Sequence, residues 1–282
     1  MFKDLMAPYI MPLQPRLPSV QSETSLKSPV RAVIFDIYGT LFISASGDIS
    51  MAQKDLLPAA NLAALFEKYK ISRSPSQIEN LLFQAIKSDH EEKKAAGINF
   101  PEVTIDRIWM QVLESKNLKI ARQFAVEYEM IINPVYPMPH LLETLQTLKQ
   151  KNIPLGIISN AQFFTPHLFD FFCSDFPDKL GFDPDLIFYS YAYGYAKPSL
   201  YLFDQAVSEL NRKGLKPADV LYVGNDMLND IYPAHTIGFQ TCLFAGDTRS
   251  LRLREKDPKC IALKPDAIII ELNQLTDMIR SF

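Results

Sequence analysis

Four apolar runs in this chain are followed by polar side chains whose types could act together in catalysis. The polar residues are Asp36, the pair Ser159 and Asn160, Lys197, and the group Asn225, Asp226 and Asp230. If the runs are parallel strands of one sheet, their carboxyl ends meet at one edge. Taken singly, each polar residue is an ordinary turn or cap residue. Together they suit attack on an electrophile that carries negative charge.

Asp36 is the candidate nucleophile, because a carboxylate can form a covalent aspartyl intermediate. Ser159 can donate a hydrogen bond to a phosphoryl or carboxylate oxygen of the substrate. Lys197 can neutralise substrate charge and help to keep Asp36 ionised. The further expected substrate contacts are Gly39, Thr40 and Asn160. We therefore expect a small, anionic molecule as the substrate.

The last polar group could bind a metal ion. Asp230, with Asp226 or Asn225, offers oxygen ligands to a hard divalent cation. Mg²⁺ is favoured where one or two carboxylates share the ion with a phosphate group and water molecules. The sequence therefore predicts Mg²⁺ as the cofactor.

The elements that must position these residues alternate between strand and helix. Apolar runs suited to buried strands lie at 31–36, 154–159, 186–190, 220–224, 240–244 and 267–270. Helical periodicity is found at 140–150, 199–213 and 230–238. This alternation predicts an α/β protein with a doubly wound parallel sheet.

The long interval between the first two strands shows helical periodicity and almost no strand pattern. Amphipathic helices are expected at 61–70, 76–97, 103–116 and 121–133. Ser76 and Glu79 form a candidate capping box, Gly97 is a candidate C-cap, and Trp109 should pack inside this unit. The predicted division is an arm at 1–29, an α/β core at 30–45 and 135–282, and a helical insertion at 46–134. Repeated prolines favour an extended arm over a helix.

Composition limits the partners and the cellular location. A net charge of −3, without a clustered basic face, argues against nucleic acid as a partner. No apolar run approaches the ~20 residues that a membrane-spanning helix needs. Three widely spaced cysteines outside any CxxC pair indicate neither a disulfide framework nor a zinc site. We expect reduced thiols in a cytoplasmic protein.

Four segments of the sequence resemble the motifs of a known family. FDIYGTLF, IISNA, YAKPSLYLF and VGNDMLNDI look like motifs one to four of the haloacid dehalogenase-like hydrolases, and the resemblance runs from about residue 31 to 272. The helical insertion resembles that superfamily's cap domain of the first type, which closes over the active site. The resemblance implies Asp36 as nucleophile, Ser159 as the motif-two hydroxyl, Lys197 as the motif-three base and Asp230 as the motif-four acid. It implies Mg²⁺ ligands from Asp36, Asp230 and the backbone carbonyl of Tyr38.

Two positions depart from the family pattern. Most phosphatases of the family carry a second aspartate, the general acid and base, where this chain has Tyr38. A tyrosine with an ordinary pKa of ~10 exchanges protons poorly at neutral pH. In motif four, Asn225 follows the glycine in place of the usual aspartate. Either Asn225 takes the place of that acid or Asp226 does, and we favour Asp226 as the contributor.

These departures leave three functions open. The leading prediction is Mg²⁺-dependent hydrolysis of a small phosphorylated metabolite. The first alternative is a 2-haloacid dehalogenase, in which halide leaves without protonation and Tyr38 is tolerable. Against it, residues 41–50 hold no arginine for a substrate carboxylate. The second alternative is a catalytically weak member that binds a phosphorylated ligand or a partner. If a side chain of the cap supplies the missing acid, the candidates are His90, Glu91 and Glu92.

Overall fold

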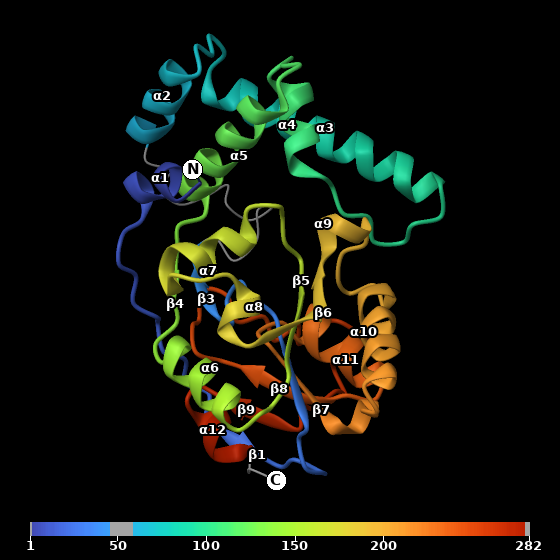
Figure 1. Ribbon diagram of the computed structural model, residues 1–282. Helices are drawn as coiled ribbons and strands as arrows, with labels where there is room; N and C mark the ends of the chain where they lie inside the picture. Colours follow the sequence, from blue (N-terminus) through green and yellow to red (C-terminus); the bar gives the residue numbers. More distant parts are fainter. Residues whose placement is uncertain (1, 46–58, 280–282) are drawn as a thin grey trace.

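The computed structural model describes residues 2–45 and 59–279, and a seven-stranded sheet lies at its centre (Figure 1). The strands are β1 (Glu23–Thr24), β2 (Ala32–Phe35), β5 (Leu155–Ser159), β6 (Phe182–Tyr189), β7 (Val220–Gly224), β8 (Gln240–Phe244) and β9 (Ala267–Ile269). Their order is β1-β9-β8-β7-β2-β5-β6. Within it only β1 runs antiparallel to its neighbour, β9. The predicted α/β class with a mostly parallel sheet is confirmed.

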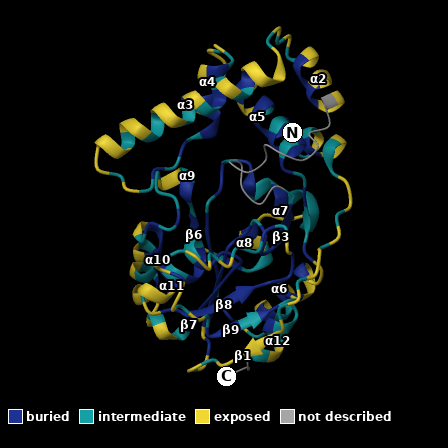
Figure 2. Cartoon of the chain, turned by 180° about the vertical axis from the view of Figure 1, so that it is seen from behind, coloured by how far each residue is buried: buried dark blue, intermediate teal, exposed yellow. Residues whose placement is uncertain are grey.

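Helices cover both faces of the sheet. They are α6 (Leu141–Gln150), α7 (Thr165–Cys173), α8 (Pro177–Leu180), α9 (Ser190–Tyr193), α10 (Tyr201–Arg212), α11 (Tyr232–Thr236) and α12 (Gln274–Met278). In β2, Ala32 and Ile34 join the apolar cluster that contains α10, whereas Val33 and Phe35 join the cluster that contains α6. A strand buried on both faces must be apolar throughout, which explains the unbroken run in the sequence. Figure 2 shows the buried strands between helices whose outer faces are exposed.

The order of the strands places β2 at a switch point. The chain continues from β2 to β5 and β6 on one side, and then crosses to β7, β8 and β9 on the other side. In such sheets the crevice at the carboxyl end of the switch-point strand is where ligands bind. Asp36 follows directly after β2, so the candidate nucleophile lies at the carboxyl end of the switch-point strand.

Four helices lie beyond this edge of the sheet (Figure 1). They are α2 (Ala59–Lys68), α3 (Pro75–Ala95), α4 (Ile105–Val112) and α5 (Leu118–Ile132), and we call them the cap. Trp109 is 1% exposed and packs edge-on against Phe124 and Tyr128, which confirms that it belongs to the core of the cap. Residues 46–58, with which the predicted insertion begins, lie outside the described residues. The division of the chain into domains therefore stays a proposal.

The connection between core and cap contains two short strands that the sequence did not indicate. β3 (Phe42–Ser44) and β4 (Val135–Pro137) form a separate antiparallel pair. With three residues each, the strands are too short to show an alternating pattern. This pair fixes the C-terminal end of α5 beside the loop that follows β2.

The N-terminus of α3 differs from the predicted one. Ser74, not Ser76, is the N-cap, and Gln77 closes the capping box in place of Glu79. The reason is Pro75, which fits the first helical position because it has no amide hydrogen to satisfy. Gly97 follows the end of the helix with a φ of +94°, which is typical of a glycine that ends a helix.

The N-terminal arm was predicted to be extended, and this is wrong for its first residues. Phe2–Met6 forms helix α1, and Ala7–Tyr9 forms a 3-10 turn. The prolines begin only at Pro8, so the preceding residues are free to form a helix that buries Met6 completely. The arm then descends along the core and ends as β1 (Figure 1). It thus contacts both the cap and the core.

Two further predictions concern membranes and cysteines. Across residues 2–45 and 59–279, the structure contains no helix with the length and apolar character needed to cross a membrane. Cys173, Cys242 and Cys260 are all free thiols, as expected.

Candidate active site

Asp36, Lys197 and Asp230 form a buried ion cluster at the carboxyl edge of the sheet. The ammonium nitrogen of Lys197 lies 2.7 Å from Oδ1 of Asp36 and 2.5 Å from Oδ1 of Asp230. The side chains of these three residues are at most 8% exposed. One lysine therefore binds two carboxylates, one directly after the switch-point strand β2 and one in the segment after β7.

Tyr222 completes this cluster, and no sequence pattern indicated its role there. Its hydroxyl accepts a hydrogen bond from Lys197 at 3.3 Å and lies 3.1 Å from Oδ1 of Asp230. It also lies 2.9 Å from the carbonyl oxygen of Ile158. In the sequence Tyr222 is simply one more apolar residue of β7, so only the fold reveals this contact.

Burial and charge set the protonation of the cluster. Burial raises the pKa of Asp230 to about 7, and the charges of Asp36 and Asp226 act in the same direction, whereas Lys197 opposes them. Burial alone would lower the pKa of Lys197, but the two carboxylates outweigh it and the pKa is raised. Lys197 is therefore an ammonium ion at neutral pH.

The candidate nucleophile, Asp36, keeps one carboxylate oxygen available. Within the described residues, only Oδ1 of Asp36 takes part in a hydrogen bond or ion pair, and Oδ2 takes part in neither. The contact with Lys197 thus fixes the carboxylate through one oxygen. The other oxygen can attack an electrophile.

Ser159 is the last residue of β5 and Asn160 follows it. Their side chains make different contacts. The hydroxyl of Ser159 is buried and has no hydrogen-bond partner among the residues described. Since a buried hydroxyl without a partner is costly, this donor suits a substrate oxygen. Asn160 instead holds the backbone of Lys197, accepting from its amide nitrogen at 2.7 Å and donating to its carbonyl oxygen at 3.3 Å. Asn160 thus fixes the loop that carries the lysine.

The environment of the Tyr38 hydroxyl does not favour acid–base catalysis. Its hydroxyl lies 2.9 Å from the hydroxyl of Thr165, the first residue of α7. Burial, followed by the negative charge of Glu129, raises the pKa of the Tyr38 hydroxyl far above its ordinary value. The Tyr38 hydroxyl is therefore protonated at neutral pH.

Gly39 permits a tight turn after Asp36. Its φ of +85° is strained for any residue with a side chain. A Cβ atom here would lie 2.5 Å from Nδ2 of Asn225 and 2.6 Å from the Cβ of Ser250. Thr40 donates to Oδ1 of Asn225 at 3.3 Å, so this turn is tied to the loop after β7.

The polar residues of the loop after β7 make different contacts. Asn225 donates to the carbonyl oxygen of Ser250 at 2.6 Å, and it accepts from Thr40. Asp226 caps the following π-helix, Met227–Ile231, and forms an ion pair of 2.6 Å with Arg254. These contacts occupy both carboxylate oxygens of Asp226, and none of these contacts is with Asp36 or Lys197. Asp230, from the same loop, contacts Lys197 instead.

The oxygen atoms around Asp36 suit Mg²⁺, which prefers carboxylates, carbonyl groups and water. Oδ2 of Asp36 is available, and Asp230 supplies the second carboxylate. Asp230 already binds Lys197 through Oδ1 and the amide of Asp226 through Oδ2. The described ranges 2–45 and 59–279 contain no group of three or more His, Cys, Asp or Glu side chains that could hold a metal. The donors therefore fit an ion that keeps water and substrate oxygens as its other ligands.

The cap reaches the core beside this cluster. The segment between α3 and α4 is bound by Gln162, which donates to the carbonyl oxygen of Val103 at 3.0 Å and accepts from the amide of Ile105 at 3.0 Å. In the same segment, Glu102 accepts from the hydroxyl of Ser190 at 2.6 Å. Within the part of the chain that the structure describes, no hydrogen bond or ion pair joins His90, Glu91 or Glu92 to Asp36 or Lys197. These predicted replacements for the missing acid gain no support.

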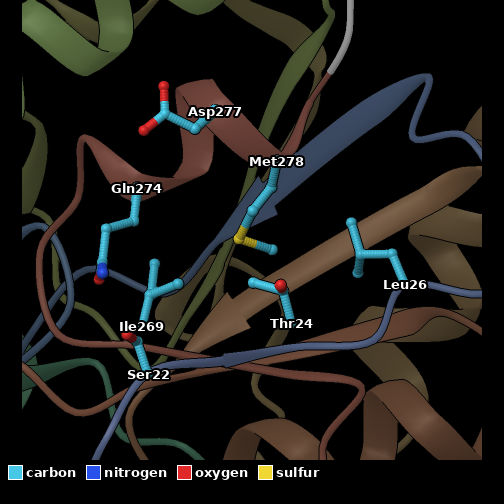
Figure 3. Close-up of a pocket in the computed structure, with 7 residues that line it drawn as sticks. All are labelled: Ser22, Thr24, Leu26, Ile269, Gln274, Asp277 and Met278. Carbon is cyan, nitrogen blue, oxygen red and sulfur yellow. The ribbon is translucent and has the colours of Figure 1, made fainter.

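A surface groove lies elsewhere, between β1, β9 and α12 (Figure 3). Its walls include Thr24, Leu26, Ile269 and Met278, with Asp277 at the side. None of the candidate catalytic residues lines it. We therefore assign it no part in the chemistry.

This chain is similar to a protein family and to curated proteins. The model of the haloacid dehalogenase-like hydrolase family matches residues 30–238. A glyceraldehyde 3-phosphate phosphatase of Methanocaldococcus jannaschii is 25% identical over 255 residues, which covers 89% of this chain and 98% of that protein. A second protein of that name, from Methanothermobacter thermautotrophicus, is 27% identical over 228 residues and covers 76% and 85% of the two chains.

Solved structures share the fold. A 2-haloacid dehalogenase from Pseudomonas syringae matches with a TM-score of 0.56 and 21% identity, covering 89% of this chain and 98% of that one. A phosphatase of the same superfamily from Thermococcus onnurineus matches with a TM-score of 0.54 and 16% identity, covering 89% and 99%. At these identities the likeness concerns the fold alone.

Proposed function

Because this chain belongs to the haloacid dehalogenase-like hydrolase family, we propose that it hydrolyses small phosphate esters through a covalent intermediate on Asp36. The observation that carries the proposal is the state of the Asp36 carboxylate. Lys197 binds Oδ1 at 2.7 Å, and Oδ2 has no hydrogen bond or ion pair within the described residues. A carboxylate that is fixed through one oxygen is ready to attack with the other.

The reaction has two steps. In the first, Oδ2 of Asp36 attacks phosphorus, an O–P bond forms, and the bond from phosphorus to the ester oxygen breaks. In the second, water attacks the aspartyl phosphate, which releases inorganic phosphate and restores Asp36. Ser159 donates its unpartnered hydroxyl hydrogen to a phosphoryl oxygen, and Lys197 neutralises negative charge.

The proposed metal ligands are the carboxylates of Asp36 and Asp230 and the backbone carbonyl of Tyr38. A bound Mg²⁺ would neutralise charge on the phosphoryl oxygens. Asn225 and Asp226 stand beside these ligands and order the loop that carries Asp230. Gly39 and Thr40 are the proposed substrate contacts in the turn after Asp36.

The two relatives named glyceraldehyde 3-phosphate phosphatase support a small phosphorylated metabolite as the substrate class. A buried cluster beneath a cap also favours a small ligand over a large one. Asp36 and Lys197 are 6% and 5% exposed.

One observation favours a second candidate, which is hydrolysis of a carbon–halogen bond. Tyr38 cannot supply a proton, and halide needs none when it leaves. In that reaction Asp36 would attack carbon and form an ester, which water would then hydrolyse.

A substrate panel separates the candidates. We expect Mg²⁺-dependent phosphate release from three-carbon phosphate esters, and no halide release from 2-chloropropionate in the absence of metal. The Asp36→Asn variant is the control, and it should fold normally and release no phosphate. Halide release without phosphate release would replace the proposal with the second candidate. If the folded protein has neither activity, a binding role remains.

A further inference from the structure

The N-terminal arm, residues 2–29, lies outside the part of the chain that the family model matches, which begins at residue 30. Its helix α1 is nevertheless packed against two parts of the molecule, α5 of the cap and α7 of the core. Met6 in this helix is completely buried. A loose tail would leave this side chain in water, so the arm has a defined seat on the body of the protein.

On the cap side, the arm joins a buried group of hydrogen bonds. The hydroxyl of Tyr9 donates to Oε2 of Glu127 at 3.0 Å. Glu127 lies on α5 and is 2% exposed, and its carboxylate also binds Lys68 of α2 at 2.7 Å and Tyr69 at 2.6 Å. Through this one carboxylate, the arm is attached to two helices of the cap.

On the core side, the same end of the arm lies on α7. The ring of Phe2 is centred 4.7 Å from the ring of His167 and 5.8 Å from the ring of Phe163. Lys3 forms an ion pair of 2.7 Å with Asp170. Because the Lys3 side chain is 43% exposed, this ion pair contributes little, and the ring contacts of Phe2 provide most of the attachment. Helix α1 therefore bridges the cap and the core directly.

The segment after α1 is bound to the core as well. The amide of Thr248, in the loop after β8, donates to the carbonyl oxygen of Arg16 at 2.8 Å. The same loop contains Ser250, whose carbonyl oxygen accepts from Asn225 at 2.6 Å. Further along, β1 pairs with β9 at the edge of the sheet. An arm that is fixed to the core in this way can restrain the cap through α1.

Besides the chain connections, the cap is thus attached to the core on two sides. One attachment is the segment between α3 and α4, where Gln162 binds Val103 and Ile105, and where Ser190 of α9 binds Glu102. The other attachment is α1. Figures 1 and 2 place the N-terminal helix and α9 on opposite sides of the junction between cap and core. A body that is held on one side can pivot about that side, whereas a body that is held on both sides cannot.

We propose that helix α1 of the N-terminal arm is a strap that keeps the cap docked on the core and limits how far the cap opens. Phe2, Met6 and Tyr9 are its positioning residues, and they act through the cap. When α1 leaves its seat, the cap can pivot about the side held by Gln162. The proposal concerns the position of the cap, so it does not depend on which bond the enzyme hydrolyses.

Two methionines of the arm provide a matched pair of substitutions. Met6 is completely buried, and Met11 is 69% exposed. Met6→Asp puts a charge into the seat of α1, and the cost of burying that charge drives the helix out. Met11→Asp makes the same chemical change in water. Met6→Leu conserves the volume and the apolar character of the buried side chain, so it should keep the helix in place.

The measurement is the distance between the cap and the core on the side of α1. Spin labels are attached to the full-length protein by Ala64→Cys in α2 and Gln146→Cys in α6, both of which are exposed positions. Cys173, which is half-buried, is replaced by serine in every protein compared. Pulsed electron resonance then gives the distribution of distances between the two labels in the folded state. A general loss of stability does not change this distribution.

We expect Met6→Asp to shift the distribution to longer distances by several ångströms and to broaden it. Met11→Asp and Met6→Leu should give the distribution of the parent protein. An unchanged distribution in Met6→Asp, or the same shift in Met11→Asp, would overturn the proposal. If Met6→Asp does not fold, Phe2→Ala decides in the same way, because it removes the ring contacts with α7 from a half-buried position. Since no turnover is measured, failure of this proposal is distinguishable from failure of the phosphatase function.

Discussion

Replacing Glu129 with glutamine should stabilise the protein at alkaline pH. Among the described residues no cation pairs with the buried Glu129 side chain, and burial raises its pKa from 4.5 to about 7. Below the lower value, the native and unfolded states both bind the proton. Between the two values only the native state binds it, and the wild-type protein loses stability as the pH rises towards 7. Above pH 7 the loss of stability caused by burying the charged Glu129 side chain is complete.

The size of the effect follows from this shift. One pKa unit corresponds to about 1.4 kcal/mol, so the rise from 4.5 to about 7 corresponds to roughly 3 kcal/mol. Glutamine has no charge to bury, and it retains the acceptor for Asn133. The free energy of unfolding of Glu129→Gln, minus that of the wild type, should therefore grow by about 2–3 kcal/mol between pH 5 and pH 8.

Urea denaturation of both proteins at several pH values measures this difference directly. Because all other ionisable groups are common to the two proteins, their contributions cancel to first order. Glu127→Gln should behave in the opposite way, since it breaks contacts with Lys68 and Tyr69 and should be less stable than the wild type. A difference between Glu129→Gln and the wild type that stays constant across this pH range would refute the reasoning.

Three other substitutions test the site and the arm. Lys197→Met leaves Asp36 and Asp230 buried without their cation; we expect a loss of ~3–5 kcal/mol in the free energy of unfolding, measured in urea, together with loss of phosphate release. Gly39→Ala forces a Cβ against Asn225 at a positive φ, so the melting temperature should fall, with a cost of ~1–3 kcal/mol from strain alone. Tyr9→Phe removes one donor from buried Glu127, and urea denaturation should show a loss of ~1 kcal/mol.

The sheet and its reactive edge could be read from the sequence because each depends on a local pattern. Runs such as 154–159 and 220–224 are apolar throughout, since both faces of a central strand are buried. The residues after these runs must then meet at one edge. For this reason Asp36, Lys197 and Asp230 could be grouped, although they are far apart along the chain.

Features that depend on a single contact could not be read in this way. Asp226 was favoured over Asn225 as the contributor to the metal site. In the structure its carboxylate pairs with Arg254, which no sequence pattern connects to this loop. The helix α1 depends on burial of Met6 against the cap, which no local pattern encodes. The 3-residue strands β3 and β4 are likewise specified by their pairing with each other.

Glu129 shows the same limit. In the sequence it is one of two glutamates in an amphipathic helix, and nothing separates it from Glu127. Among the described residues, the fold gives Glu127 a lysine and two tyrosine hydroxyls as partners, whereas Glu129 has the side-chain amide of Asn133. The alkaline-pH prediction for Glu129→Gln therefore follows from tertiary contacts that no local pattern encodes.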